Sequence, residues 1–395
     1  MIPDDPIVIC GAARTPIGGF QGDLKDLTAP QLGAIAIRAA VERAGLGPDA
    51  IDEVLFGCVL PAGVGQAPAR QASMGAGLKP STGATTVNKV CGSGMKAAML
   101  AHDLLVAGSA RVAVAGGMES MTNAPYLLDR ARAGYRLGHQ RALDHMFLDG
   151  LEDAYDKGRL MGTFAEKCAS MYSFTRAEQD AYSLESLKRA QKAGSDGSFA
   201  AETVPVIVKE RGVERVVSQD EQPLKARPEK IPLLKPAFDE NGTVTAGNSS
   251  SISDGAAALV LMRRTEAERR GIAPKAVIVG HATYSQEPSL FTTAPIGAIR
   301  RLLARTGWTI DEVDLFEINE AFAVVAMAAM RDLGLPHEKV NVHGGACALG
   351  HPIGASGARL IVTLLAALEK YGLKRGIASL CIGGGEAVAM AVERV

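Results

Sequence analysis

The sequence lacks the features that mark membrane, secreted or nucleic-acid-binding proteins. No segment reaches the ~18 uninterrupted apolar residues that a membrane-spanning helix needs. Residues 1–5 do not have the basic-then-apolar order of a secretory signal. Positive and negative side chains nearly cancel, 42 against 43, so nothing global attracts nucleic acid or an anionic membrane. These absences predict a cytoplasmic protein that binds neither membrane nor nucleic acid.

Cysteine is also scarce, whereas glycine is abundant. Six cysteines are spread over 395 residues without the close spacing of a disulfide framework, which predicts reduced thiols. The 44 glycines exceed the usual share of ~7%. Many of them stand in short clusters, which indicates tight turns or close backbone approach where a Cβ would not fit.

Strand and helix signals alternate along most of the chain. Apolar runs at 6–10, 53–58, 85–90 and 111–115 predict strands, and the periodicity of 29–44 and 95–107 predicts helices. This alternation favours an α/β fold with parallel sheets covered by helices. A chain of 395 residues is too long for one ordinary core, so we expect two or three domains.

A short segment occurs twice. Residues 51–57 (IDEVLFG) resemble residues 310–317 (IDEVDLFE). Asp52 precedes Cys91 by 39 positions, and Asp311 precedes His351 by 40. Cys91 and His351 each open a glycine-rich turn before an apolar helix. The sequence therefore predicts two similar α/β halves that face each other, each pointing a helix N-terminus at one shared site.

Residues 121–250 break this rhythm, because they carry many charges and several prolines. We expect them to form a long insertion over the site. Within it, basic residues gather between 209 and 235 in a set made of Lys209, Arg211, Arg215, Lys225, Arg227, Lys230 and Lys235. Such a cluster is either a solvated surface or a contact zone for phosphate groups.

Cys91 is the strongest candidate for a nucleophile. It stands where a predicted strand runs into a predicted helix, and backbone N–H groups with the helix dipole predict a lowered cysteine pKa there. Gly92 and Gly94 would let backbone and substrate approach closely. The alternative is a buried structural cysteine, but glycines at a strand-to-helix turn favour the nucleophile.

His351 is the candidate base for that thiol, because it lies in the equivalent turn of the second half. A zinc site is an alternative, since His343, Cys347 and His351 are spaced by four and would share one face of a helix. Gly344, Gly345, Gly350 and Pro352 interrupt this stretch and argue against a continuous helix.

Two strand ends supply the other candidates. Cys381 ends an apolar strand before three glycines, whose backbone N–H groups fit an oxyanion hole better than a phosphate loop, because no Walker lysine or dinucleotide fingerprint is present. Asn319 follows the strand predicted at 315–318 and is either a helix cap or the holder of a catalytic water.

These segments together resemble the thiolase family over nearly the whole chain. The blocks that match, in order, are Asn88–Lys96, Asn319–Phe322, Gly350–Pro352 and Cys381–Gly385. The resemblance implies two similar five-layered α/β/α/β/α halves with an inserted loop domain. It places the first half at 1–120 plus 251–271, the loop domain at 121–250, and the second half at 272–395.

The resemblance also implies residue roles. Cys91 is acylated, and His351 activates it and forms one oxyanion hole with a water held by Asn319. Backbone N–H groups of Cys91 and Gly383 form the other oxyanion hole, and Cys381 moves the proton on the substrate α-carbon. The implied substrate-binding residues are Leu160, Met161, Phe238, Ser250, Phe291 and Phe322. Acetyl-CoA and 3-ketoacyl-CoA are the expected partners, with no metal and no permanently bound cofactor, in a homotetramer built as a dimer of dimers.

Two positions depart from relatives specialised for acetoacetyl-CoA. Leu160 stands where a histidine is common, and Phe291 where methionine is frequent, so a broader 3-ketoacyl-CoA thiolase is an alternative to an acetyl-CoA acetyltransferase. A β-ketoacyl-carrier-protein synthase is a further alternative, although its extra basic residue is replaced here by Cys381. A lipid-transfer or scaffold protein is disfavoured, because all four reactive positions are intact.

Overall fold

A computed structural model describes residues 4–210 and 212–395. In this part of the chain ten strands form one mixed sheet of order β12-β13-β14-β11-β1-β10-β5-β3-β4, with β2 beside β10. The strands are β1 (Ile7–Arg14), β2 (Gly18–Gly19), β3 (Glu53–Gly57), β4 (Gly83–Val87), β5 (Val112–Ser120), β10 (Ser253–Arg263), β11 (Ala276–Ser285), β12 (Leu315–Ile318), β13 (Arg375–Ile382) and β14 (Glu386–Arg394).

The strand order reveals two equivalent halves. β1 and β11 pair only at Val8–Val277 and Ile9–Ala276, so two half-sheets meet there. One half has the order β4-β3-β5-β10-β1 and the other β12-β13-β14-β11. The place of β4 in the second half is held by Val340, which forms a parallel bridge with Phe316 of β12. This equivalence confirms the duplication that the repeated segment predicts.

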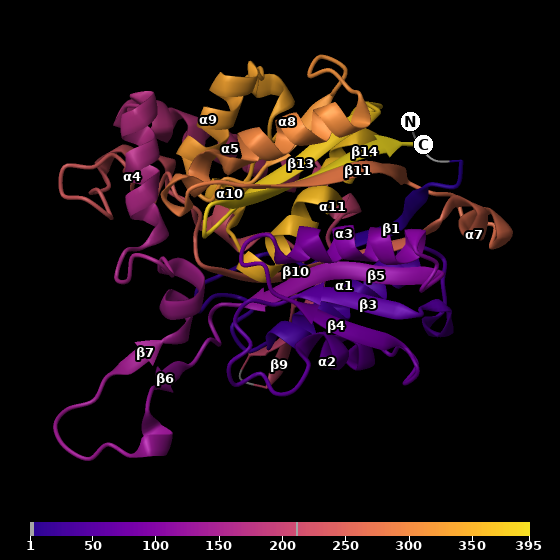
Figure 1. The fold of residues 1–395 in the computed structure, drawn as a ribbon, viewed down its shortest axis with the longest axis horizontal. Coiled ribbons are helices and arrows are strands. Elements are labelled where there is room, and N and C mark those ends of the chain that lie inside the picture. Colours follow the sequence, from indigo (N-terminus) through magenta and orange to yellow (C-terminus); the bar gives the residue numbers. More distant parts are fainter. Residues whose placement is uncertain (1–3, 211) are drawn as a thin grey trace.

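The predicted α/β/α/β/α layering is also present, and the two halves share it (Figure 1). The helices α3 (Ser93–Val106) and α11 (Ile353–Tyr371) pack together in the central layer, against both half-sheets. The helices α1 (Ala29–Arg43) and α2 (Pro68–Gly75) cover the outer face of the first half-sheet, and α8 (Ala294–Thr306) and α9 (Ala323–Leu333) that of the second. The whole molecule therefore has five layers.

Glycines let α3 and α11 pack closely at their N-terminal ends. A Cβ on Gly94 would lie 2.8 Å from the backbone N of Ala358, and one on Gly357 would lie 2.4 Å from that of Met95. Gly94 thus makes room for the other helix, whereas the sequence suggested room for substrate. This close packing brings the turns that precede the two helices together.

The expectation of parallel sheets is wrong. Only β3–β4, β3–β5 and β12–β13 are parallel, and the other neighbouring strands are antiparallel. A parallel pair needs a long crossover, usually a helix, whereas β13 and β14 are joined by the short turn of residues 383–385 and so form a hairpin.

The segment 121–250 contributes two hairpins and several helices. Its main elements are β6 (Tyr126–Leu128), β7 (Ala142–Asp144), the π-helical turn η3 (Phe147–Leu151), α4 (Met161–Tyr172), α5 (Arg176–Ser195), β8 (Val206–Glu210), β9 (Val213–Val217) and α6 (Glu221–Lys225). The β6–β7 hairpin projects from the body (Figure 1). Buried Arg14 of β1 holds the segment through Asp220 at 2.7 Å and Glu202 at 2.5 Å. Within the described residues no helix is long and apolar enough to span a membrane.

Candidate active site

Cys91 lies in a tight turn between β4 and α3. The preceding residue, Val90, has φ of 45°, a left-handed conformation that is rare for a β-branched residue. The Val90 N–H donates to Asn88 Oδ1 at 3.0 Å, and the Ser93 hydroxyl donates to the Val90 carbonyl at 2.6 Å. The Lys89 N–H in turn donates to Ser93 Oγ at 2.8 Å. These bonds hold the strained turn and direct Cys91 into a cavity.

The pKa of Cys91 is not lowered, contrary to the expectation from its position. Burial raises the pKa to about 11, although the backbone N–H groups of Gly383 and of Cys91 itself act in the opposite direction. Desolvation of the thiolate therefore outweighs the favourable helix N-terminus. Cys91 rests as a thiol that already faces two N–H donors.

His351 precedes α11 and is held in one tautomer. The Ser356 hydroxyl donates its hydrogen to the Pro352 carbonyl at 2.9 Å, so it accepts from His351 Nδ1 at 2.5 Å. Nδ1 is therefore protonated, and Nε2 is left with the lone pair that a base needs. Burial lowers the pKa of His351 to about 3, so the imidazole is neutral near pH 7. Ser356 was not among the predicted site residues, although it lies in the block that follows His351.

Asn319 directly follows β12 and faces His351. Its Nδ2 lies 3.4 Å from His351 Nε2. The first residue of α9 is Ala323 and its N-cap is Phe322, so Asn319 is not a helix cap. Its buried Oδ1 accepts no hydrogen bond from any residue that the structure describes. Of the two roles that the sequence left open, the helix cap is excluded, and holding a catalytic water stays a prediction.

Cys381 lies at the end of β13 and is fully buried. Its pKa is raised well above the ordinary value by burial and, after that, by the nearby Cys91 sulfur. The Lys89–Glu386 ion pair fixes the Cys91 turn to the first residue of β14, the strand that follows Cys381 and its glycine turn. Two protonated thiols from opposite halves thus lie close together.

A cavity of about 360 Å³ joins these groups to the predicted substrate residues. Cys91, His351 and Gly383 line it, while Asn319 and Cys381 are not part of its lining. All six predicted substrate residues line it, namely Leu160, Met161, Phe238, Ser250, Phe291 and Phe322. Thirteen further lining residues were missed from the sequence, among them Met121, Phe147, Gly150 and Leu151. Three of these come from the π-helical turn η3, which periodicity does not reveal.

A second cavity of about 290 Å³ adjoins the first and shares Ala246, Ser249 and Ser251 with it. Lys225, Arg227 and Lys230 line it, so part of the basic segment lies beside the site. Lys209 and Arg215 of the segment do not line this cavity. Lys209 lies on β8, and Arg215 on β9 forms an ion pair with Asp23. Arg211 lies outside the described residues.

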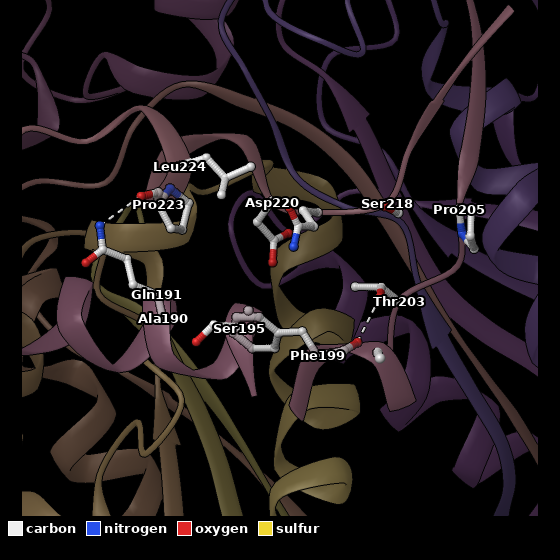
Figure 2. Close-up of a pocket in the computed structure, with 13 residues that line it drawn as sticks. Ala190, Gln191, Ser195, Phe199, Thr203, Pro205, Ser218, Asp220, Pro223 and Leu224 are labelled. Carbon is white, nitrogen blue, oxygen red and sulfur yellow. Dashed lines mark hydrogen bonds between the residues drawn. The ribbon is translucent and has the colours of Figure 1, made fainter. Parts of the chain in front are cut away.

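A larger cavity, of about 510 Å³, lies elsewhere (Figure 2). The Gln191 side chain bonds to the Pro223 carbonyl on one side of it, and Phe199 and Thr203 lie on another. None of the predicted site residues lines it, and it holds neither a cysteine nor a histidine. It is therefore separate from the candidate active site.

The zinc alternative does not fit the structure. Helix α10 covers only Ala346–Leu349, and Gly344 and Gly350 on either side have positive φ values of 79° and 103°. His343, Cys347 and His351 therefore do not share one helix face, which was the geometry that the spacing of four required.

Comparison with known proteins identifies the family of the chain. The family description "Thiolase, N-terminal domain" matches residues 7–265, and "Thiolase, C-terminal domain" matches residues 272–394. The chain therefore belongs to the thiolase family.

Relatives that carry the name acetyl-CoA acetyltransferase align over nearly the whole chain. The protein of Chromobacterium violaceum is 47% identical over 98% of this chain and 99% of its own length. That of Syntrophomonas wolfei is 48% identical over 98% of each chain. Acetyl-CoA acetyltransferase 2 of Arabidopsis thaliana is 51% identical over 98% of this chain and 96% of its own length.

Proposed function

We propose that this thiolase is an acetyl-CoA C-acetyltransferase. It would join two acetyl-CoA molecules into acetoacetyl-CoA and CoA, or cleave acetoacetyl-CoA in reverse, through an acetyl-Cys91 intermediate. The observation that carries the proposal is the position of Cys91, which faces the Gly383 N–H in a cavity that His351 also lines. The names of the full-length relatives support the same reaction.

In the cleavage direction, His351 Nε2 takes the Cys91 proton as the sulfur attacks the 3-keto carbon. The bond between C2 and C3 breaks, and the Cys381 thiol gives its proton to C2, so that acetyl-CoA leaves. A raised thiol pKa suits a proton donor, and Cys381 has one. The enzyme is left with acetyl-Cys91, protonated His351 and the Cys381 thiolate.

The second half-reaction restores the enzyme. The Cys381 thiolate takes the proton of the incoming CoA thiol, and the CoA sulfur attacks acetyl-Cys91. The bond to Cys91 breaks, and its sulfur recovers the proton from His351. The N–H groups of Cys91 and Gly383 would stabilise one developing oxyanion, and His351 with a water held by Asn319 the other. Condensation is the same sequence reversed.

Coenzyme A would lie across the two adjoining cavities. Its thioester end would enter the cavity of Cys91 past Ser250, and its phosphates would lie near Arg227 and Lys230 in the second cavity. The coenzyme A thioesters are substrates, and no step of this mechanism uses a metal or a bound cofactor. We also propose a cytoplasmic homotetramer acting in fatty acid metabolism, with its domains divided as the sequence predicts.

A broader 3-ketoacyl-CoA thiolase is a second candidate, because Leu160 gives the cavity an apolar wall. Each methylene buried there is worth up to ~0.8 kcal/mol. Phe291 opposes this, because it is buried beside Phe164 with ring centroids 6.4 Å apart and fills space that a longer chain would need. Comparing kcat/KM for C4, C6 and C8 substrates decides between them.

The central test is to trap the intermediate. Acetyl-CoA without acceptor should acetylate Cys91, as peptide mass spectrometry after a rapid acid quench would show, and acetoacetyl-CoA with CoA should give ping-pong kinetics. A label on Cys381 with Cys91 free would reject the assignment. Absence of turnover with free CoA would instead favour a carrier-protein synthase or a non-enzyme.

A further inference from the structure

Away from the active site, three potential metal ligands converge where the two halves meet. His102 and Asp103 lie near the C-terminal end of α3, and His281 lies in β11. His102 Nδ1 and His281 Nε2 each lie 3.0 Å from Asp103 Oδ1. The three ligand atoms all lie within 4.8 Å of one another, and no other such group occurs in residues 4–210 and 212–395.

We propose that His102, Asp103 and His281 bind a divalent ion of the zinc class. Two imidazole nitrogens and a carboxylate oxygen are a common ligand set for zinc, with a solvent molecule as the fourth ligand. Bonds of about 2.0–2.2 Å place tetrahedral ligands about 3.3 Å apart. The two distances from Asp103 Oδ1 to the histidine nitrogens therefore need to lengthen by only a few tenths of an ångström.

The chemistry of the three side chains permits a metal ion to replace the hydrogen bonds between them. Each histidine now donates a hydrogen to Asp103, and a neutral imidazole releases that nitrogen by moving its hydrogen to the other one. Solvent can reach the site because the Asp103 side chain is 56% exposed, while those of His102 and His281 are 19% and 11% exposed.

The position on α3 also favours a cation. Helix α3 has 14 residues, and His102 and Asp103 lie in its last turns, at the negative end of the helix dipole. Two arginines oppose a cation here: Arg263 donates to the Val106 carbonyl at 2.7 Å, and Arg305 donates to the His281 carbonyl at 2.9 Å. Because α3 and β11 belong to different halves, a bound ion would fasten the halves together at the end of α3 opposite to Cys91.

The site can be tested with zinc alone, titrated in competition with a fluorescent chelator. We expect one equivalent to bind the wild-type protein and His139→Ala, whose histidine lies on the exposed β6–β7 loop. His281→Ala should weaken binding roughly a hundredfold or more, because even outer partners of metal ligands are worth 10–100-fold. Asp103→Asn keeps an acceptor for both histidines but loses the anionic ligand, so it should also weaken binding.

The active-site thiols are a competing zinc site, and Cys91→Ala identifies them. The proposal would be overturned if Cys91→Ala lost the bound zinc while His281→Ala and Asp103→Asn kept it. Failure of the wild type to bind zinc would also overturn it. Cobalt(II) gives an independent readout, because nitrogen and oxygen ligands produce no thiolate charge-transfer band. Zinc should also raise the Tm of the wild type and of Cys91→Ala, and leave that of Asp103→Asn unchanged.

Discussion

At the scale of single residues, the site shows how burial changes the chemistry expected from position. A helix N-terminus lowers a cysteine pKa when the sulfur is solvated, but Cys91 is enclosed by residues of both halves, and its pKa is raised to about 11. With His351 neutral, the resting pair is thiol and imidazole. The identities of these residues could be predicted from the sequence, whereas their protonation depends on atoms contributed by distant segments.

The raised pKa of Cys91 predicts a particular pH dependence of alkylation. A pKa of about 11 leaves about one thiolate in a thousand at pH 8. The rate at which iodoacetamide labels Cys91 should therefore rise about tenfold for each pH unit from 7 to 9, as measured by peptide mass spectrometry. A plateau below pH 8 would mean that the thiolate is stabilised after all.

Ser356 should act as a positioning residue for His351. Ser356→Ala removes the acceptor of the Nδ1 hydrogen, so the imidazole loses its fixed tautomer, and kcat should fall about 10–100-fold with KM for CoA nearly unchanged. Ser379→Ala is the matched control, since the hydroxyl of this buried serine donates only to the Val388 carbonyl at 2.9 Å, and the backbone carbonyl that accepts from the Asn319 N–H is kept. Equal losses in both variants, or a change confined to KM, would contradict the role.

At the scale of elements, the sequence predicted several strands of the main sheet and the helices α1, α3 and α11, but not how the strands pair. The repeated segment begins β3 and β12, and the glycine-rich turns before α3 and α11 are where they were expected. The direction of a strand depends on the path by which the chain returns to the sheet. The direction of β10 could not be predicted, because the long insertion precedes it. Likewise η3 has no periodic signature, so Phe147 and Leu151 became site residues only through packing.

The basic segment yields a prediction about coenzyme A. Arg227→Glu or Lys230→Glu should raise KM for CoA several-fold at low salt, because both residues line the cavity beside Ser249. The effect should shrink as salt rises, since exposed charges are screened over about 10 Å at 0.1 M. Lys209→Glu, on β8 and outside that cavity, is the control. An unchanged KM in both cavity variants would leave the segment as a solvated surface.

At the scale of the whole molecule, the active site needs both halves and the inserted segment of the same chain. The first half supplies Cys91, the second His351, Asn319, Cys381 and Gly383, and the insertion supplies the wall around Leu160 and Phe238. The buried Arg14 network ties the insertion to β1. Every residue assigned a chemical role in the proposal therefore comes from this chain.

We propose that the β6–β7 hairpin holds the proposed tetramer together. It projects from the body and exposes apolar side chains, with Tyr126 69%, Leu128 59% and Leu137 93% exposed (Figure 1). Contiguous exposed apolar patches mark interaction sites, and this hairpin, unlike the body of the protein, stands clear of the other elements (Figure 1). Leu128→Asp with Leu137→Asp should convert a particle of four 41.2 kDa chains into dimers in light scattering after size exclusion.

A second hairpin provides the control, because β8 and β9 also expose apolar residues. Ile207 and Val216 are 58% and 61% exposed, and replacing both by Asp should leave the tetramer intact. Since Cys91, His351 and Gly383 come from one chain, the dimeric variant should still form acetyl-Cys91. Its turnover should fall only if a looser β7 disturbs η3. This turn begins three residues after β7 and lines the cavity. A wild-type dimer, a tetramer that survives the β6–β7 substitutions, or dissociation caused by the β8–β9 substitutions would each refute this assignment.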